Sequence, residues 1–232
     1  MSEGCSGCTG LCCYDVVVHV TPFDVWRIVA AQALAPLQVV EPREATAGEI
    51  VAEAFGARID DTPRLFCSVL RKSSLEPGAC QFLMHLGDER KRCGIYPDRP
   101  RVCAVYPFVM RNGSVDLRGD ARCETGDWNM ARLDYALVRR QLAVYHAEWC
   151  ACARIVEVWN LAVETGHRAP SFEVFVAFAH EIAGRLLSDK AADVELLERW
   201  DEALLPREVE VRRDAWLDGV TRAAQAALTA VN

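Results

Sequence analysis

The chain has 232 residues, of which 51% are hydrophobic, and it carries a formal net charge of −7. This composition suits one sizeable domain, or a small domain with a helical extension, and it can bury a core. The acidic balance lacks the basic footprint of a nucleic-acid-binding protein, so we expect no nucleic-acid partner. No apolar run reaches the roughly 18 residues of a membrane span, and the N-terminus does not resemble a signal peptide, which predicts a cytoplasmic protein.

The first predicted elements are a loop, a strand and a helix. Residues 1–13 are rich in Gly and Cys without periodicity, which indicates a loop. The β-branched segment 14–20 predicts a strand. Thr21-Pro22 is a typical helix start, because threonine caps well and proline is tolerated in the first turn; the helix should end near Ala33. A second short helix is predicted after Thr46.

Short strands and irregular segments are predicted for the middle of the chain. Strands are expected at 65–70 and 80–85, joined by a polar turn. The proline-containing segment 93–108 is expected to be irregular. Residues 108–117 predict a β-hairpin that turns at Asn112-Gly113.

From about residue 127 the pattern becomes helical to the end of the chain. Apolar residues recur with alternating spacings of four and three, which predicts one face of a long helix: Val138, Leu142, Tyr145, Trp149, Cys152, Val156, Trp159 and Val163. Further helices are predicted after Ser171 and over roughly 207–230. The fold class is therefore α+β. A small, irregular, cysteine-rich metal domain with short strands is expected over 1–126, followed by a helical region over 127–232 that packs on it.

The first group of candidate ligands lies at the start of the chain. Four thiols fall within nine residues, between glycines, in Cys5-Ser-Gly-Cys8-Thr-Gly-Leu-Cys12-Cys13. Thiolates are soft ligands, so this density is typical of a site for a thiophilic metal. The chain has 11 cysteines, an odd number, and the cytoplasm keeps thiols reduced. Disulfides therefore do not account for the cluster, and we expect a metal site.

A second, dispersed group consists of Cys80, Cys93, Cys103 and Cys123. A short pattern occurs twice within it, as Cys-Gly-Ile-Tyr-Pro from position 93 and Cys-Ala-Val-Tyr-Pro from position 103. Each proline restricts the tyrosine before it and stiffens the segment. A rigid backbone orders the ligands before the metal arrives and so lowers the entropy cost of binding.

The combined pattern resembles the YkgJ-like cysteine-cluster family of zinc- or iron-chelating domains, often labelled iron–sulfur oxidoreductases. The similarity lies in Cys-x2-Cys-x3-Cys-Cys, then Cys80, then Cys-x-Ile-Tyr-x-x-Arg-Pro-x-x-Cys over 93–103, and it covers about residues 5–126. Arg99-Pro100 corresponds to the family's Arg-Pro. The resemblance implies eight thiolate ligands: Cys5, Cys8, Cys12, Cys13, Cys80, Cys93, Cys103 and Cys123.

Ligand spacing bears on which metal is bound. Structural zinc commonly uses two CxxC pairs, whereas this chain has one, Cys5 to Cys8. Iron–sulfur clusters accept dispersed single thiolates more readily. The adjacent Cys12 and Cys13 point apart and suit two irons, or two centres, better than one zinc. We expect one or two iron–sulfur clusters of the 4Fe-4S type, with zinc as the alternative.

Other residues near the cysteines have separate interpretations. Cys152 in the helical stripe and Cys67 in an apolar strand are expected to be buried core residues. Arg99 is expected near the metal centre, where a guanidinium stabilises an anionic cluster, and Tyr96 is a candidate hydrogen-bond donor to sulfur. Arg92 and Arg101 are expected to be ordinary surface charges. The sequence assigns no catalytic residue.

Three functions are compatible with these features. The first is an iron–sulfur protein that transfers electrons or acts as an oxidoreductase with a redox partner. The second is metal-dependent protein methyl transfer, which the resemblance implies because a related domain occurs in flagellin lysine N-methylases. The third is a zinc-binding structural module whose helical half docks a protein partner.

Overall fold

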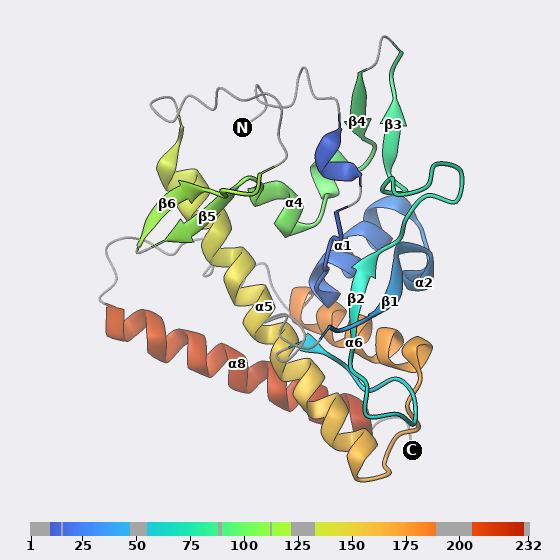
Figure 1. The fold of residues 1–232 in the computed structure, drawn as a ribbon. Coiled ribbons are helices and arrows are strands. Elements are labelled where there is room, and N and C mark those ends of the chain that lie inside the picture. Colours follow the sequence, from blue (N-terminus) through green and yellow to red (C-terminus); the bar gives the residue numbers. More distant parts are fainter. Residues whose placement is uncertain are drawn as a thin grey trace.

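The structure, a computed structural model, describes residues 10–14, 16–46, 55–87, 90–111, 113–121, 133–188 and 206–229. Short antiparallel strands occupy the N-terminal half and long helices the C-terminal half, which confirms the predicted α+β class (Figure 1). The loop expected at 1–9 and most of the helix expected after Thr46 lie outside the described residues. The proposed domain boundary at 126/127 also lies outside them and stays a prediction.

The first helix begins and ends as the sequence predicted. Helix α1 spans Pro22–Gln32, and Ala33 ends it in the left-handed conformation with φ 52°. A reciprocal capping box starts it: Asp24 N donates to Thr21 Oγ1 at 3.2 Å, and Thr21 N donates to Asp24 Oδ2 at 3.0 Å. Both residues are buried, so the cap also fixes how the helix enters the core.

Replacing Thr21 with Ala should lower the free energy of unfolding by about 1–2 kcal/mol. The change removes the cap of α1 and also the Thr21 hydroxyl that donates to the buried Asp24 carboxylate at 2.9 Å. Ser171→Ala is the matched control, because both bonds of the Ser171 hydroxyl are exposed: it accepts from Val174 N at 3.4 Å and donates to Glu173 Oε2 at 2.7 Å. Urea unfolding of both variants measures the difference, and equal losses would contradict this interpretation.

The described strands form separate two-stranded antiparallel sheets. The pairs are β1 Val40–Glu44 with β2 Phe66–Leu70, β3 Leu83–His85 with β4 Lys91–Cys93, and β5 Phe108–Arg111 with β6 Ser114–Leu117. Strand β2 and the β5–β6 hairpin confirm the predictions, and Gly113 supplies the positive φ of 77° that the hairpin turn needs. The strand predicted at 80–85 forms only in its second half.

Some local predictions were wrong. The described residues 14 and 16–20 form no strand, only isolated bridges at Tyr14 and His19, because they reach β2 at few backbone positions. The segment 93–108 is not wholly irregular: it contains the 3₁₀ turn η3 Tyr96–Asp98 and the helix α4 Arg101–Val105. Proline is compatible with a helix start, which explains why Pro97 and Pro100 begin these turns rather than prevent them. The short helix α2 Pro36–Val39 and strand β1 were not predicted.

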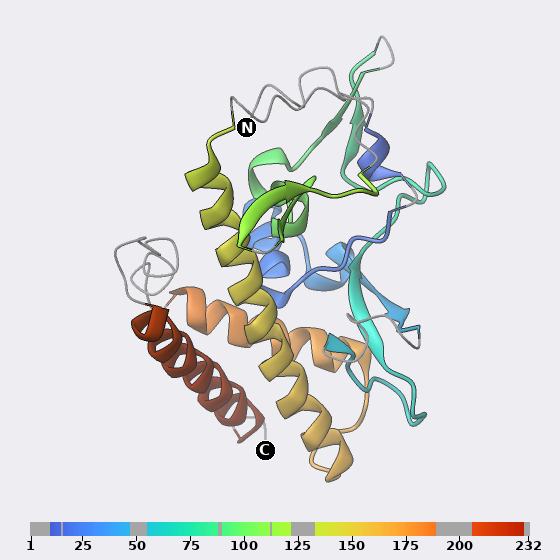
Figure 2. The ribbon, with the colours of Figure 1, turned by 60° about the vertical axis from the view of Figure 1, so that its left-hand side comes forward.

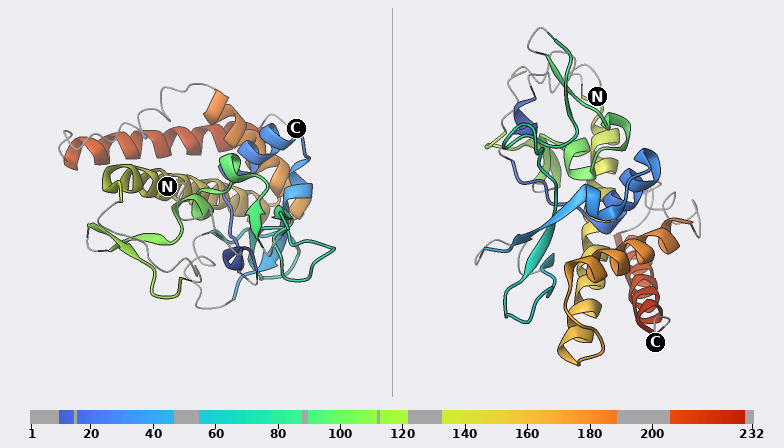
Figure 3. Two further views of the ribbon diagram at one scale, coloured as in Figure 1. Left: turned by 90° about the horizontal axis from the view of Figure 1, so that it is seen from above. Right: turned by 90° about the vertical axis from the view of Figure 1, so that its right-hand side faces the viewer.

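Three long helices form the C-terminal half: α5 Tyr135–Glu164, α6 Phe172–Ser188 and α8 Pro206–Thr229. Helix α6 packs against α1 and α8, and α8 also packs against α5 (Figures 2 and 3). The predicted stripe of α5 faces inward, and Trp159 in it is fully buried. Within the described residues, no helix combines the length and the apolar character needed to cross a bilayer.

Helix α5 takes part in two hydrophobic cores. Its second half joins α1, α6 and α8 in the main core, around residues such as Phe23, Ile155 and Ile182. Its first half packs against α4 and the β5–β6 hairpin in a smaller core that includes Val105 and Val138 (Figure 1). Helix α5 therefore connects the helical part of the molecule to α4, which carries one of the candidate ligands.

Candidate metal centre

Five of the eight predicted ligands lie in the described part of the chain, and all five line one cavity of about 1000 Å³. They come from separate segments: Cys12 and Cys13 from the 3₁₀ turn η2 Leu11–Cys13, Cys80 from the turn before β3, Cys93 from the end of β4 and Cys103 from α4. The cysteines are present as thiols. Cys5, Cys8 and Cys123 lie outside the described residues, so their place in the site stays a prediction.

Backbone contacts hold η2 beside the other cysteines. Cys80 N donates to Cys13 O at 2.7 Å, which joins the two ligand segments directly. Gly10 precedes η2 with φ 78°, and a Cβ there would approach Lys91 Cβ to 3.1 Å and Leu83 Cδ1 to 3.2 Å. Only glycine fits both the conformation and the space. The glycine next to the first cysteine group therefore lets η2 pack closely on the β3–β4 hairpin.

The thiols influence one another electrostatically. Burial raises the pKa of the Cys103 thiol well above its ordinary value, and charges on Cys80, Cys12 and Cys93 raise it further. Burial also raises the pKa of Cys80, with Cys93 adding to the shift. All four thiols line the same cavity. A bound cation would favour their thiolate forms, and metal binding would release the protons.

The described thiols do not yet form a closed ligand shell. Within the described ranges, no three Cys, His, Asp or Glu side chains are placed to hold a single metal ion. A ligand shell therefore requires these side chains to rotate, or the participation of the predicted cysteines outside those ranges. The donor set itself fits a soft or borderline metal, since thiolates select zinc and iron–sulfur centres over magnesium or calcium.

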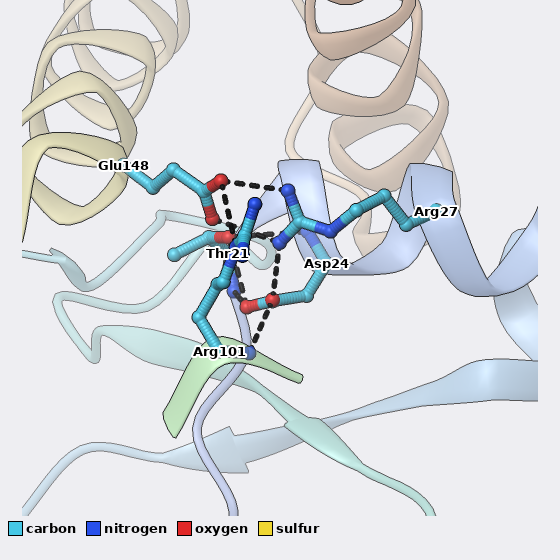
Figure 4. Close-up of polar contacts among 5 residues, drawn as sticks. All are labelled: Thr21, Asp24, Arg27, Arg101 and Glu148. Atoms are coloured by element: carbon cyan, nitrogen blue, oxygen red, sulfur yellow. Dashed lines mark hydrogen bonds and ion pairs between the residues drawn. The ribbon is translucent and has the colours of Figure 1, made fainter. Parts of the chain in front are cut away.

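A buried ion network lies between α4, α1 and α5 and joins the three helices (Figure 4). The Arg27 guanidinium donates to Asp24 Oδ1 at 2.6 Å and to both carboxylate oxygens of Glu148, at 2.6 and 2.8 Å. Asp24 Oδ1 also accepts from Arg101 N at 2.8 Å, and this amide belongs to the first turn of α4. An α1 carboxylate thus satisfies an end group of the helix that carries Cys103.

The charges of this network balance within a buried region. Asp24 and Glu148 are 2% and 5% exposed, and the Arg101 Nε lies 3.5 Å from Glu148 Oε1, so two guanidiniums face two carboxylates. Burial raises the pKa of Glu148, while the hydrogen bond and charge of Arg27 oppose that rise. Arg101 is thus part of a buried network, and its interpretation as a surface charge was wrong.

Part of this network could be recognised from the sequence. Thr21-x-x-Asp24 before an apolar helix is a recognisable capping box, so Asp24 could be assigned a local role. The other members Arg101 and Glu148 lie 77 and 124 positions beyond Asp24 in the chain, and no local pattern links them to it. The network could be recognised only once α1, α4 and α5 were brought together.

Arg99 and Tyr96 also line the cysteine cavity. The Arg99 guanidinium stacks on the Tyr96 ring, with Cζ 3.8 Å from the ring centroid. Both residues therefore lie in the same cavity as the five described thiols. Their contact with a metal centre stays a prediction.

Cys67 and Cys152 are only 4% and 5% exposed and belong to the hydrophobic core, as expected. Neither lines the cysteine cavity. Cys152→Ala should therefore leave the metal content of the purified protein unchanged and lower the free energy of unfolding by about 1–2 kcal/mol, because it removes one buried sulfur atom. Metal analysis and urea unfolding check this, and loss of metal would show that Cys152 is a ligand.

Comparison with known proteins adds one finding to this geometry. No curated protein and no solved structure matches the chain. The model of one family, CxxCxxCC, described as "putative zinc- or iron-chelating domain", matches residues 4–150. The match spans more than half of the chain and includes all eight predicted ligands. The gathered thiols and this match together show that the chain belongs to the CxxCxxCC family of zinc- or iron-chelating domains.

Proposed function

We propose that this protein binds an iron–sulfur cluster at the cysteine cavity and uses it to transfer electrons, alone or as part of an oxidoreductase. One observation carries the proposal: single thiols from separate segments, η2, the turn before β3, β4 and α4, line the same cavity. Iron–sulfur clusters are held by such dispersed single thiolates, since each iron needs only one or two of them from the protein.

The proposed ligands are the eight cysteines singled out from the sequence: Cys5, Cys8, Cys12, Cys13, Cys80, Cys93, Cys103 and Cys123. When bound, a cluster of the 4Fe-4S type would supply one-electron transfer. The residues around it have separate tasks. The buried network of Asp24, Arg27 and Glu148 orients α4, and the half-buried Arg99 places positive charge beside the thiolates.

A zinc-binding structural module is the second candidate. Four of the described thiols, on Cys12, Cys80, Cys93 and Cys103, line the same cavity, and four thiolates form a common structural zinc site. The family description also names zinc beside iron. Methyl transfer, which the resemblance also implies, gains no support from the described residues.

Purification of the native protein without oxygen distinguishes these functions. The visible spectrum would be recorded first, followed by assays of iron, acid-labile sulfide and zinc per chain. Brown protein with iron and sulfide that bleaches on reduction is the expected result. Colourless protein with stoichiometric zinc and no response to reductant would exclude the redox proposal and favour the structural module.

A further inference from the structure

The cavity that contains the cysteines is strongly cationic. Its described lining carries five basic side chains and one carboxylate: Arg90, Lys91, Arg92, Arg99, Arg118 and Asp120. The chain as a whole is acidic, with a formal net charge of −7, so this concentration of positive charge is a local feature. A cleft lined by charge of one sign attracts ligands of the opposite sign.

The basic side chains differ in how they are engaged. Arg118 pairs with Asp120 through two bonds of 3.0 and 2.8 Å. Lys91 donates to the Tyr14 hydroxyl at 2.6 Å and covers its ring. Arg92 and Arg99 are engaged differently from Arg118 and Lys91. Within the described residues, the guanidiniums of Arg92 and Arg99 contact the ring of Tyr96.

The contacts with Tyr96 leave both guanidiniums able to bind a ligand. Arg99 Cζ lies 3.8 Å from the centroid of the ring and Arg92 Cζ lies 5.8 Å from it. Stacking uses the face of a guanidinium and leaves its N–H donors, which lie in its plane, available. A planar pair of donors matches the two oxygens of a carboxylate or phosphate. Tyr96 therefore holds the two guanidiniums close together and leaves their N–H donors available to a ligand.

A metal centre alone does not account for the size of this cavity. The cavity, at about 1000 Å³, is at the upper end of the volumes of small-molecule sites, about 300–1000 Å³. Tyr106, Tyr145 and Trp149 add aromatic surface to its wall, which suits the apolar part of a ligand.

We propose that Arg92 and Arg99, held by Tyr96, bind the oxyanion of a small-molecule ligand that enters the cavity beside the cysteines. The shared chemistry is a carboxylate or a phosphate group. A small molecule fits better than a macromolecule, because these side chains line a cavity and not a flat face. The description of this ligand as a substrate rests on the proposed redox function, whereas the binding itself does not.

Calorimetric titration of the full chain, purified without oxygen, tests this inference. One titration uses inorganic phosphate and the other uses citrate, so that phosphate binding and carboxylate binding are measured separately. We expect one of them to bind with one-to-one stoichiometry. The double variant R92Q/R99Q should weaken that binding by at least about tenfold, since each change removes a charge-assisted hydrogen-bond donor. Arg118→Gln, whose guanidinium is occupied by Asp120, should bind as the wild type does.

Several results would overturn the inference. The first is that the wild type binds neither anion. The second is that the double variant binds as tightly as the wild type, and the third is that Arg118→Gln loses as much affinity as the double variant. If the double variant does not fold, Arg92→Gln alone replaces it, because Arg92 is an exposed side chain. Metal content, measured on the same samples, separates the two proposals. Anion binding by a protein without iron would support the anion site and refute the redox function. An iron–sulfur protein that binds neither anion would support the redox function and refute the anion site.

Discussion

Replacing Cys103 with Ser should abolish stable metal binding, with a loss of affinity of at least about 100-fold. Cys103 lines the cavity together with Cys12, Cys13, Cys80 and Cys93, and burial and the charges of Cys80, Cys12 and Cys93 raise its pKa. Serine nearly preserves the shape of the side chain but replaces a soft sulfur with a hard hydroxyl oxygen, which zinc and iron–sulfur centres bind poorly. Metal per chain after gel filtration, and the visible spectrum, measure the effect.

The control for this variant is Cys152→Ala, which removes a buried sulfur outside the cavity. We expect Cys103→Ser to lose metal and Cys152→Ala to keep it, although both remove a thiol. Circular dichroism would show whether Cys103→Ser retains its helices, which lie mostly in α5, α6 and α8. A folded Cys103→Ser protein with its full complement of metal would remove Cys103 from the ligand set.

The second large effect is expected at Glu148, where Glu148→Ala should lower the free energy of unfolding by about 3–5 kcal/mol. The Glu148 side chain is 7% exposed and accepts two bonds from Arg27, whose side chain is 22% exposed. Its removal leaves Arg27 facing Asp24 alone and also removes the counter-charge of Arg101. Urea or guanidinium unfolding of the metal-free protein measures the loss.

Glu157→Ala is the matched control on the same helix. Glu157 pairs with Arg154 at 2.8 Å, but its side chain is 66% exposed, so its removal should cost no more than about 1 kcal/mol. A similar small loss in Glu148→Ala would show that the buried network contributes little to stability. Glu148→Ala should also weaken metal binding, because α4 loses part of the support for its first turn; Glu157→Ala should not.

The fold was most predictable where a periodic pattern extended over a long segment. The α5 stripe was visible because 3.6-residue periodicity continued through a helix of 30 residues. Helix α1 was predictable because Thr21 and Pro22 together mark a helix start. The β5–β6 hairpin was predictable from its Asn-Gly turn.

Strand β1 and helix α4 were not predicted, and there are physical reasons for this. Strand β1 contains Pro42 and alternates weakly, and its pairing with β2 is a tertiary contact across 21 intervening residues. Helix α4 has five residues and no apolar period of its own. It forms because Asp24 and the small core around Val105 support it from outside. Elements this short are determined by their neighbours more than by their own sequence.

The candidate site was predictable in composition but not in arrangement. Cysteine spacing identified the thiols at 12, 13, 80, 93 and 103, and the structure gathers all five around one cavity. That Arg101 joins Glu148 and Arg27 in one network could not be predicted, since ion pairs of this kind depend on long-range packing. The sequence also did not reveal that Arg92 and Arg99 share one tyrosine ring.

X-ray absorption spectroscopy of the protein purified without oxygen tests directly whether the cysteines hold an iron–sulfur cluster. We expect absorption at the iron edge, with sulfur as the neighbouring atom and a second shell from other iron atoms. Both shells should be lost in Cys103→Ser. Zinc with four sulfur neighbours and no iron would contradict the iron–sulfur proposal while leaving the cysteine site in place. A metal bound only by oxygen or nitrogen would contradict the assignment of these cysteines as ligands.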